Sequence, residues 1–73
     1  MPLSVINTIE YLVLIVSEFA NKTHISEWEA YDYLGNYGAF ALCEKHYGVM
    51  HTLSVEENIE SLIEYCRKRG GKL

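Results

Sequence analysis

Residues 54–69, SVEENIESLIEYCRKR, decide the fold class of this chain. Ser54 can cap a helix with its side chain, and Glu57 three residues later completes a capping box. Gly70-Gly71 indicates where this helix ends. Between these signals, apolar residues recur every three or four positions, which is the spacing of one buried helical stripe: Val55, Ile59, Leu62, Ile63 and Cys66. The stretch therefore predicts an amphipathic surface helix from Ser54 to Arg69.

Three more helices are predicted upstream. A second capping box, Ser26…Glu29, opens a helix that ends near Gly35-Asn36. The N-terminal helix follows Pro2-Leu3, with Ser4 as its N-cap, and runs to about Asn21; the remaining helix runs from about Ala39 to His46, and an extension past Gly48 to Met50 stays open. The prediction is an all-α fold, a compact bundle of four short helices, in a single domain over residues 1–73.

Helical periodicity also predicts which residues form the core. At 100° per residue, one side of each helix collects its large apolar residues. The predicted core comprises Val5, Ile9, Leu12, Val16, Phe19, Tyr31, Leu34, Phe40, Cys43, Tyr47, Ile59, Leu62, Ile63 and Cys66.

Charge is unevenly distributed along the sequence. Residues 1–64 carry all ten acidic residues and only two lysines, whereas residues 65–73 carry four basic residues. A nucleic-acid-binding protein usually has a basic face, and the body of this domain would repel phosphate. The basic end has a plainer role, because cations at a helix C-terminus complement the helix dipole. We therefore expect no nucleic-acid partner.

Cysteine content and hydropathy indicate a cytoplasmic protein. Only Cys43 and Cys66 are present, whereas a small secreted domain usually carries several disulfides. Glu10 interrupts the N-terminal apolar segment, so we expect no signal peptide. The longest strictly apolar run, residues 11–16, is too short to span a membrane, and we expect no membrane association.

The N-terminal helix carries more apolar surface than three other short helices can cover. Tyr11, Leu14 and Ile15 fall outside its core stripe, and its only charges are Glu10 and Glu18. A helix that is apolar nearly all round is buried nearly all round. We interpret Tyr11, Leu14, Ile15 and Glu18 as a binding surface for a protein partner or a second copy of the chain. The alternative is that these apolar residues are scattered on the surface, which is common.

Residue types that could build a metal or nucleophilic site are Cys43, His46, His51 and Cys66. Cys43 and His46 share one helical turn, but structural zinc sites favour tight Cys-x-x-Cys or His-x-x-x-His pairs, and none is present. Glu44 points about 100° away from Cys43 on a helix, and no glycine-rich oxyanion turn follows. We therefore expect a protein that is not an enzyme, with no metal site and no cofactor.

The two short helices in the middle of the chain leave a second function open, a helix-turn-helix regulator that binds nucleic acid. A recognition helix needs Arg, Lys, Asn or Gln to contact bases and phosphates. The candidate, residues 39–50, carries only Lys45 of these, beside Glu44, and the preceding helix carries three acidic residues. Because the acidic charge of these helices disfavours contact with nucleic acid, the helix-turn-helix regulator is the alternative function.

Residues 47–52, YGVMHT, are the most distinctive stretch of the chain. In a structural interpretation Tyr47 and Met50 pack inward, His51 lies at a helix C-terminus, and Thr52 bonds to a nearby backbone group. In a functional interpretation a polar patch that receives a partner forms from Tyr31, Tyr37, Tyr47, His51 and Thr52. We favour the structural interpretation, because polar groups near helix ends usually serve the backbone.

The central stretch also resembles a known family. Ser26-x-x-Glu29-Ala30-Tyr31-x-x-Leu34-x-x-Tyr37-Gly38-Ala39, followed by Tyr47-x-x-Met50-His51-Thr52, resembles a group of short bacterial proteins catalogued as a domain of unknown function (3791), over residues 9–68. Met50 stands where Leu is usual, Ala39 where Val is usual, and His46 where a large apolar residue is common.

The family has no established activity and no assigned catalytic residues. Its genes often lie beside genes for predicted ADP-ribosyltransferase-like toxins, so the resemblance implies a small accessory or antitoxin-like partner. Together with the apolar N-terminal helix, it favours a non-catalytic protein-interaction module that binds a protein partner or forms a homo-oligomer.

Overall fold

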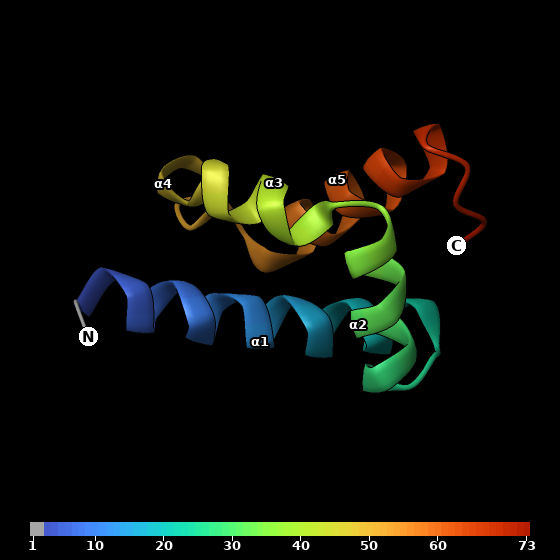
Figure 1. Ribbon diagram of the computed structural model, residues 1–73, viewed down its shortest axis with the longest axis horizontal. Helices are drawn as coiled ribbons and strands as arrows, with labels where there is room; N and C mark the ends of the chain where they lie inside the picture. Colours follow the sequence, from blue (N-terminus) through green and yellow to red (C-terminus); the bar gives the residue numbers. More distant parts are fainter. Residues whose placement is uncertain (1–2) are drawn as a thin grey trace.

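The computed structural model describes residues 3–73, and their side chains from Thr8 onward. The described chain contains no strand, and its five helices are α1 (Leu3–Thr23), α2 (Glu27–Asn36), α3 (Ala39–Lys45), α4 (Tyr47–Met50) and α5 (Val55–Lys68). α1 forms one layer, α3, α4 and α5 form a second layer, and α2 joins the two layers near the C-terminal end of α1 (Figure 1). The all-α prediction is confirmed, with a Cα radius of gyration of 11.6 Å.

The helix predicted from Ala39 onward is divided in two, so the predicted count of four helices is wrong. His46 has non-helical φ and ψ of −110° and 18°, and it caps both α3 and α4. Its N–H donates to the Leu42 carbonyl at 3.0 Å, and its carbonyl accepts from the Met50 N–H at 2.9 Å. The bend at His46 turns Met50 into the core, where its exposed fraction is 8%.

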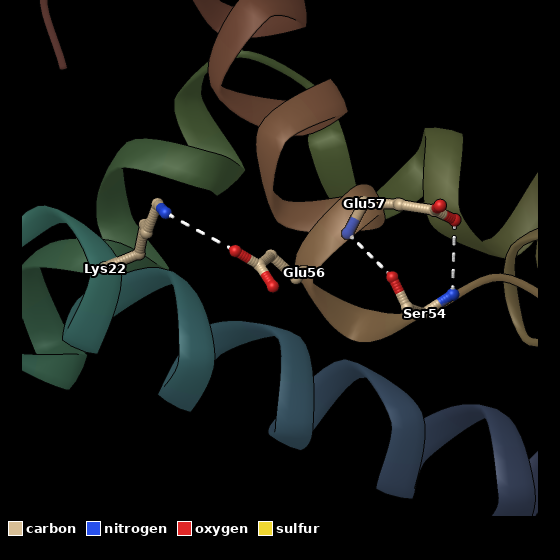
Figure 2. Close-up of polar contacts among 4 residues, drawn as sticks. All are labelled: Lys22, Ser54, Glu56 and Glu57. Atoms are coloured by element: carbon tan, nitrogen blue, oxygen red, sulfur yellow. Dashed lines mark hydrogen bonds and ion pairs between the residues drawn. The ribbon is translucent and has the colours of Figure 1, made fainter.

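Both predicted capping boxes are confirmed. The Ser54 hydroxyl accepts from the Glu57 N–H at 3.1 Å, and the Glu57 carboxylate accepts from the Ser54 N–H at 3.4 Å (Figure 2). Ser26 and Glu29 make the same pair of bonds at the start of α2. A side-chain cap of this kind is worth about 1 kcal/mol, so two local sequence signals fix where α2 and α5 begin.

The start of α1 differs from the prediction. α1 already includes Leu3, so Ser4 lies within the helix and is not its N-cap. The side chain of Val5, which the sequence places in the core, lies outside the described residues. At its other end α1 reaches Lys22, whose ammonium lies 3.9 Å from the Glu56 carboxylate in the first turn of α5 (Figure 2). Within residues 3–73, no helix is both long enough and apolar enough to cross a membrane.

Six of the predicted core residues are buried, and the prediction of which residues of α1 face the core is partly wrong. Phe19, Leu34, Cys43, Ile59, Leu62 and Cys66 are each at most 3% exposed. Leu12, Val16, Phe40 and Ile63 are half-buried against this core, whereas Tyr47 is half-buried without packing on it. Ile9 and Tyr31 are 48% and 54% exposed, so their assignment to the core is wrong, and Ile15, assigned to the outside, is completely buried.

The correction on α1 has a physical cause. Glu10, Ser17 and Asn21 share one side of α1, opposite Ile15 and Phe19, and the predicted core stripe was displaced around the helix from that buried side. Tyr11, whose hydroxyl accepts a hydrogen bond from Asn58 of α5, lies on the core side. Tyr11, Ile15 and Phe19 follow one another at four-residue intervals along this side.

The C-terminal segment folds back on the bundle. Gly70, at φ 99°, is left-handed and donates to the Arg67 carbonyl at 3.1 Å, while Gly71 donates to the Cys66 carbonyl at 2.9 Å. This pair of bonds is the Schellman motif, and it confirms the predicted stop after Arg69. The Leu73 N–H then donates to the Tyr33 hydroxyl at 3.3 Å, so the last residues pack against α2.

Candidate docking groove

A groove of about 630 Å³ lies between α1, the first turns of α2, and α3. We call it the docking groove. Its lining is apolar except at two positions, and it consists of Ile9, Leu12, Val13, Val16, Glu27, Trp28, Tyr31, Phe40 and Glu44. Three helices that are consecutive in the sequence contribute to it, so the groove depends on their packing rather than on one motif.

One wall of the docking groove is aromatic. Trp28 and Tyr31 stack with ring centroids 5.8 Å apart and an interplanar angle of 20°, and Tyr31 approaches Phe40 at 5.4 Å. Trp28 is 71% exposed although it is the largest side chain in the protein. A stacked pair is held in place before any ligand arrives, so little side-chain freedom would be lost on binding.

The opposite wall is aliphatic and belongs to α1. Ile9 and Val13 are one turn apart and are 48% and 63% exposed, while Leu12 and Val16 are half-buried beneath them. The excess apolar surface that the sequence predicts on α1 is therefore real. It lies on the side of Ile9 and Val13 and not on the side of Ile15.

Electrostatically the docking groove is acidic. Glu27 and Glu44 are exposed at its edge, and no Lys, Arg or His among the described residues lines it. Glu27 lies in the first turn of α2, where the helix dipole favours a carboxylate. The groove thus offers apolar walls to a ligand and negative charge at its rim.

Of the four residues predicted on α1 as a partner surface, only Leu14 and Glu18 are exposed. Ile15 is completely buried, so its assignment to a partner surface is wrong. Tyr11 is half-buried, and its ring meets the Tyr47 ring edge-on at 5.4 Å. Leu14 is 41% exposed outside the docking groove, and Glu18 lines a separate hollow with Lys22 and Glu56.

The predicted polar patch is divided between two ends of the molecule. Tyr47 and His51 stack at 4.9 Å, and Thr52 follows them in the chain. Tyr31 belongs to the aromatic wall of the docking groove, and Tyr37 packs against Tyr33 at 4.9 Å. α2 and α4 lie at opposite ends of the bundle (Figure 1), so the five residues form no single patch.

The local contacts expected from the structural interpretation of residues 47–52 are present. The Thr52 hydroxyl donates to the Val49 carbonyl at 2.6 Å, and the His51 ring Nδ1 lies 2.7 Å from the Tyr47 carbonyl. Met50 is buried, and its carbonyl accepts from the Asn58 amide at 2.7 Å. The distinctive stretch therefore terminates α4 and connects it to α5.

Neither cysteine has the environment of a reactive thiol. Burial, together with the neighbouring Cys66 and Glu44, raises the pKa of the Cys43 thiol to about 11. Burial likewise raises the pKa of Cys66, an effect that Arg69 partly offsets. Both thiols are free and no more than 1% exposed. Because the thiolate is the nucleophile, these thiols are unreactive at neutral pH.

Within the described residues, no group of three or more His, Cys, Asp or Glu side chains could hold a metal ion.

Sequence reasoning missed Trp28 and Val13 as surface residues of the groove. On α2 the buried positions are Ala30 and Leu34, and a helix that buries those two turns Trp28 away from the core. An aromatic pair three residues apart and off the core stripe was the signal that could have found the aromatic wall. On α1 the corresponding signal was weaker: Glu10, Ser17 and Asn21 share one side of the helix, opposite the buried Ile15 and Phe19.

The fold and groove define a small all-helical protein with a preformed apolar surface. A family model described as a protein of unknown function (DUF3791) matches residues 10–69, and the chain belongs to this family. The resemblance drawn from the central motifs is thereby confirmed at the level of family. No curated protein and no solved structure matches the chain, so an activity has to be argued from the surface itself.

Proposed function

We propose that this chain is a non-catalytic protein-interaction module that receives a partner in the docking groove. The observation that carries the proposal is the exposure of four large apolar side chains that line one groove: Ile9, Val13, Trp28 and Tyr31. Exposed apolar residues that are grouped together and rimmed by polar residues are typical of interaction sites. An accessory or antitoxin-like role, implied by the gene neighbourhood of the family, is one form of this proposal.

The shape of the groove supports a protein segment rather than a small molecule. Its volume lies within the range of small-molecule sites, but those sites enclose most of the ligand. Here Trp28, Val13 and Tyr31 each remain more than half exposed, so the groove is open along its length. An open apolar groove between helices suits a helix that lays one face into it.

The charge of the same region supports a partner other than nucleic acid. Glu27 and Glu44 lie at the rim, and they would repel a phosphate backbone. No observation on α2 or α3 favours the helix-turn-helix alternative, and we do not propose it. The two buried free cysteines suit a reducing compartment, and we propose that the module acts in the cytoplasm.

Photo-crosslinking in cells that express the protein tests this proposal. A benzophenone side chain at Val13 should give a discrete protein adduct that disappears when Trp28→Ala is combined with it. The same side chain at Glu60, which is exposed on α5 and does not line the groove, is the matched control and should give no such adduct. Equal adducts at both positions, or none at Val13, would refute the proposal.

A further inference from the structure

The charge of the docking groove indicates the kind of partner it fits. We infer that the occupant is a basic amphipathic helix of another protein, an inference that rests on the proposed interaction function. Glu27 of α2 and Glu44 of α3 both line the groove and both remain exposed to solvent. With no cation among the described lining residues, these carboxylates are available to Lys or Arg side chains that flank the apolar face of an incoming helix.

A second copy of the chain is a poor occupant. In a symmetric dimer the same surface meets itself, so the rim carboxylates of both copies, Glu27 and Glu44, would be brought into one interface. Like charges brought together in this way oppose association. The groove therefore selects against its own copy on charge alone.

Nor does any helix within the described residues 3–73 have the basic amphipathic character needed to occupy the groove of a neighbour. Four of the six Lys and Arg residues lie at the end of α5 or after it, and the apolar stripe of that helix is already buried in the core. Three of those four also have partners: Lys68 pairs with Glu64 at 3.3 Å, Arg67 donates to the Leu73 carbonyl at 2.6 Å, and Arg69 lies 3.6 Å from the centre of the Tyr65 ring. The complementary helix must come from another protein.

The length of the groove sets the length of the contact. Its α1 wall runs from Ile9 to Val16, which at 1.5 Å per residue is roughly 10 Å, or two helical turns. An occupant of this length offers two or three apolar side chains on one face, spaced at three and four residues. These side chains would lie between Val13 and the Trp28–Tyr31 stack, with basic residues on both sides of them.

Trp28 makes the inference directly measurable, because it is the only tryptophan and lines the groove. The probe is a synthetic peptide of about 14 residues, a length at which isolated helices begin to form, with Leu on one helical face and Lys elsewhere. Two control peptides carry Glu in place of every Lys, or the same Leu and Lys in a scrambled order. Only the patterned Leu–Lys peptide should shift Trp28 emission to the blue and bind saturably, with an affinity that falls as salt is added.

Variants separate the specific contact from general attraction to an acidic protein. Val13→Asp should abolish the emission shift, and Glu27→Gln combined with Glu44→Gln should weaken binding about fivefold and flatten its salt dependence. The charge-matched control is Glu60→Gln combined with Glu64→Gln on the exposed side of α5, which should leave the affinity within about twofold of the parent.

Each remaining outcome overturns the inference and bears differently on the proposed function. If the Leu–Glu peptide binds as tightly, or if the two rim substitutions change nothing, the partner is not selected by basic charge although the groove still docks a helix. If no peptide shifts Trp28, a basic helix is not recognised, and the Val13 crosslinking decides the proposed function separately. A wild type that light scattering finds to be dimeric, with Trp28 already shielded and Val13→Asp monomeric, would make the second copy the occupant.

Discussion

The side-chain amide of Asn58 on α5 donates a hydrogen bond to the Tyr11 hydroxyl on α1 at 2.5 Å. The same Nδ2 donates to the Met50 carbonyl at the end of α4 at 2.7 Å. Asn58 is 2% exposed and is the one polar residue among the described buried side chains. One amide therefore joins three helices, on the side of α1 that faces the core.

Replacing the Asn58 side chain should strongly destabilise the protein, because its amide bonds to two other helices. Asn58→Ala leaves the Met50 carbonyl and the Tyr11 hydroxyl without their donor and opens a cavity, so we expect a loss of about 2–3 kcal/mol in the free energy of unfolding. Tyr11→Phe removes only the hydroxyl and should cost about 1 kcal/mol. Urea unfolding followed by circular dichroism measures both. If Asn58→Ala costs no more than Glu60→Ala on the exposed side of α5, Asn58 does not join these helices.

The orientation of α1 can be tested with two substitutions on the same helix. Ile15 is completely buried, so Ile15→Ala should cost about 2–4 kcal/mol of stability. Val13 is 63% exposed in the docking groove, so Val13→Ala should change stability by less than about 0.5 kcal/mol. Urea midpoints of the two variants make the comparison. A larger loss for Val13→Ala than for Ile15→Ala would place the core on the other side of α1.

The features that the sequence predicts well are those that depend on residues close together in the chain. The beginnings of α2 and α5 follow from Ser26…Glu29 and Ser54…Glu57, because a capping box acts within four residues. The amphipathic stripe of α5 is likewise predictable, because its polar side is unambiguous. The bend at His46 was not predictable, since it depends on where Met50 finds the core and on Asn58, which lies on a different helix.

The candidate site was predictable only in part, for the same reason. The excess of apolar surface on α1 is a property of composition, and the structure confirms that some of it remains exposed. Its location is a property of tertiary packing. With Tyr11, Ile15 and Phe19 on the core side of α1, Ile9 and Val13 line the groove together with Trp28, on the side that periodicity assigned to the core.

Close packing at the C-terminus leaves no room for a side chain at Gly71. A Cβ at this position would lie 2.0 Å from the Tyr33 hydroxyl oxygen and 2.8 Å from the Cys66 carbonyl oxygen. Gly71→Ala must therefore displace Tyr33 or open the Schellman bond, and we expect a loss of about 1–2 kcal/mol in the free energy of unfolding. Tyr33→Phe in the same chain should restore part of that loss. The measurement is again the urea midpoint.

Gly48 provides the matched control for that substitution. It lies within α4, and a Cβ there would meet no atom within 4 Å. Gly48→Ala should therefore stabilise the protein by about 0.5–1 kcal/mol, because alanine loses less backbone entropy in a helix. Equal losses for Gly71→Ala and Gly48→Ala would mean that the close approach to Tyr33 has no energetic consequence.

The buried thiol of Cys43 should make stability fall at alkaline pH. Its pKa is about 11 in the folded chain against 9.0 for the ordinary thiol, so between these values the folded state retains a proton that the unfolded state releases. Stability is therefore complete below pH 9 and falls as pH rises toward 11. For a shift of this size the loss amounts to about 2–3 kcal/mol. The raised pKa of Cys66 adds a loss of the same sign.

Urea unfolding at successive pH values from about 8 to 11 measures this dependence, and Cys43→Ala is the control because it removes the titrating group. The variant should be less stable than the parent at neutral pH, since it creates a small cavity, yet its stability should fall less steeply above about pH 9. Both native thiols should also react with a thiol reagent only as fast as the chain unfolds. Rapid labelling of the folded protein at mildly alkaline pH, or identical pH slopes with and without Cys43, would show that this thiol is not held protonated by burial.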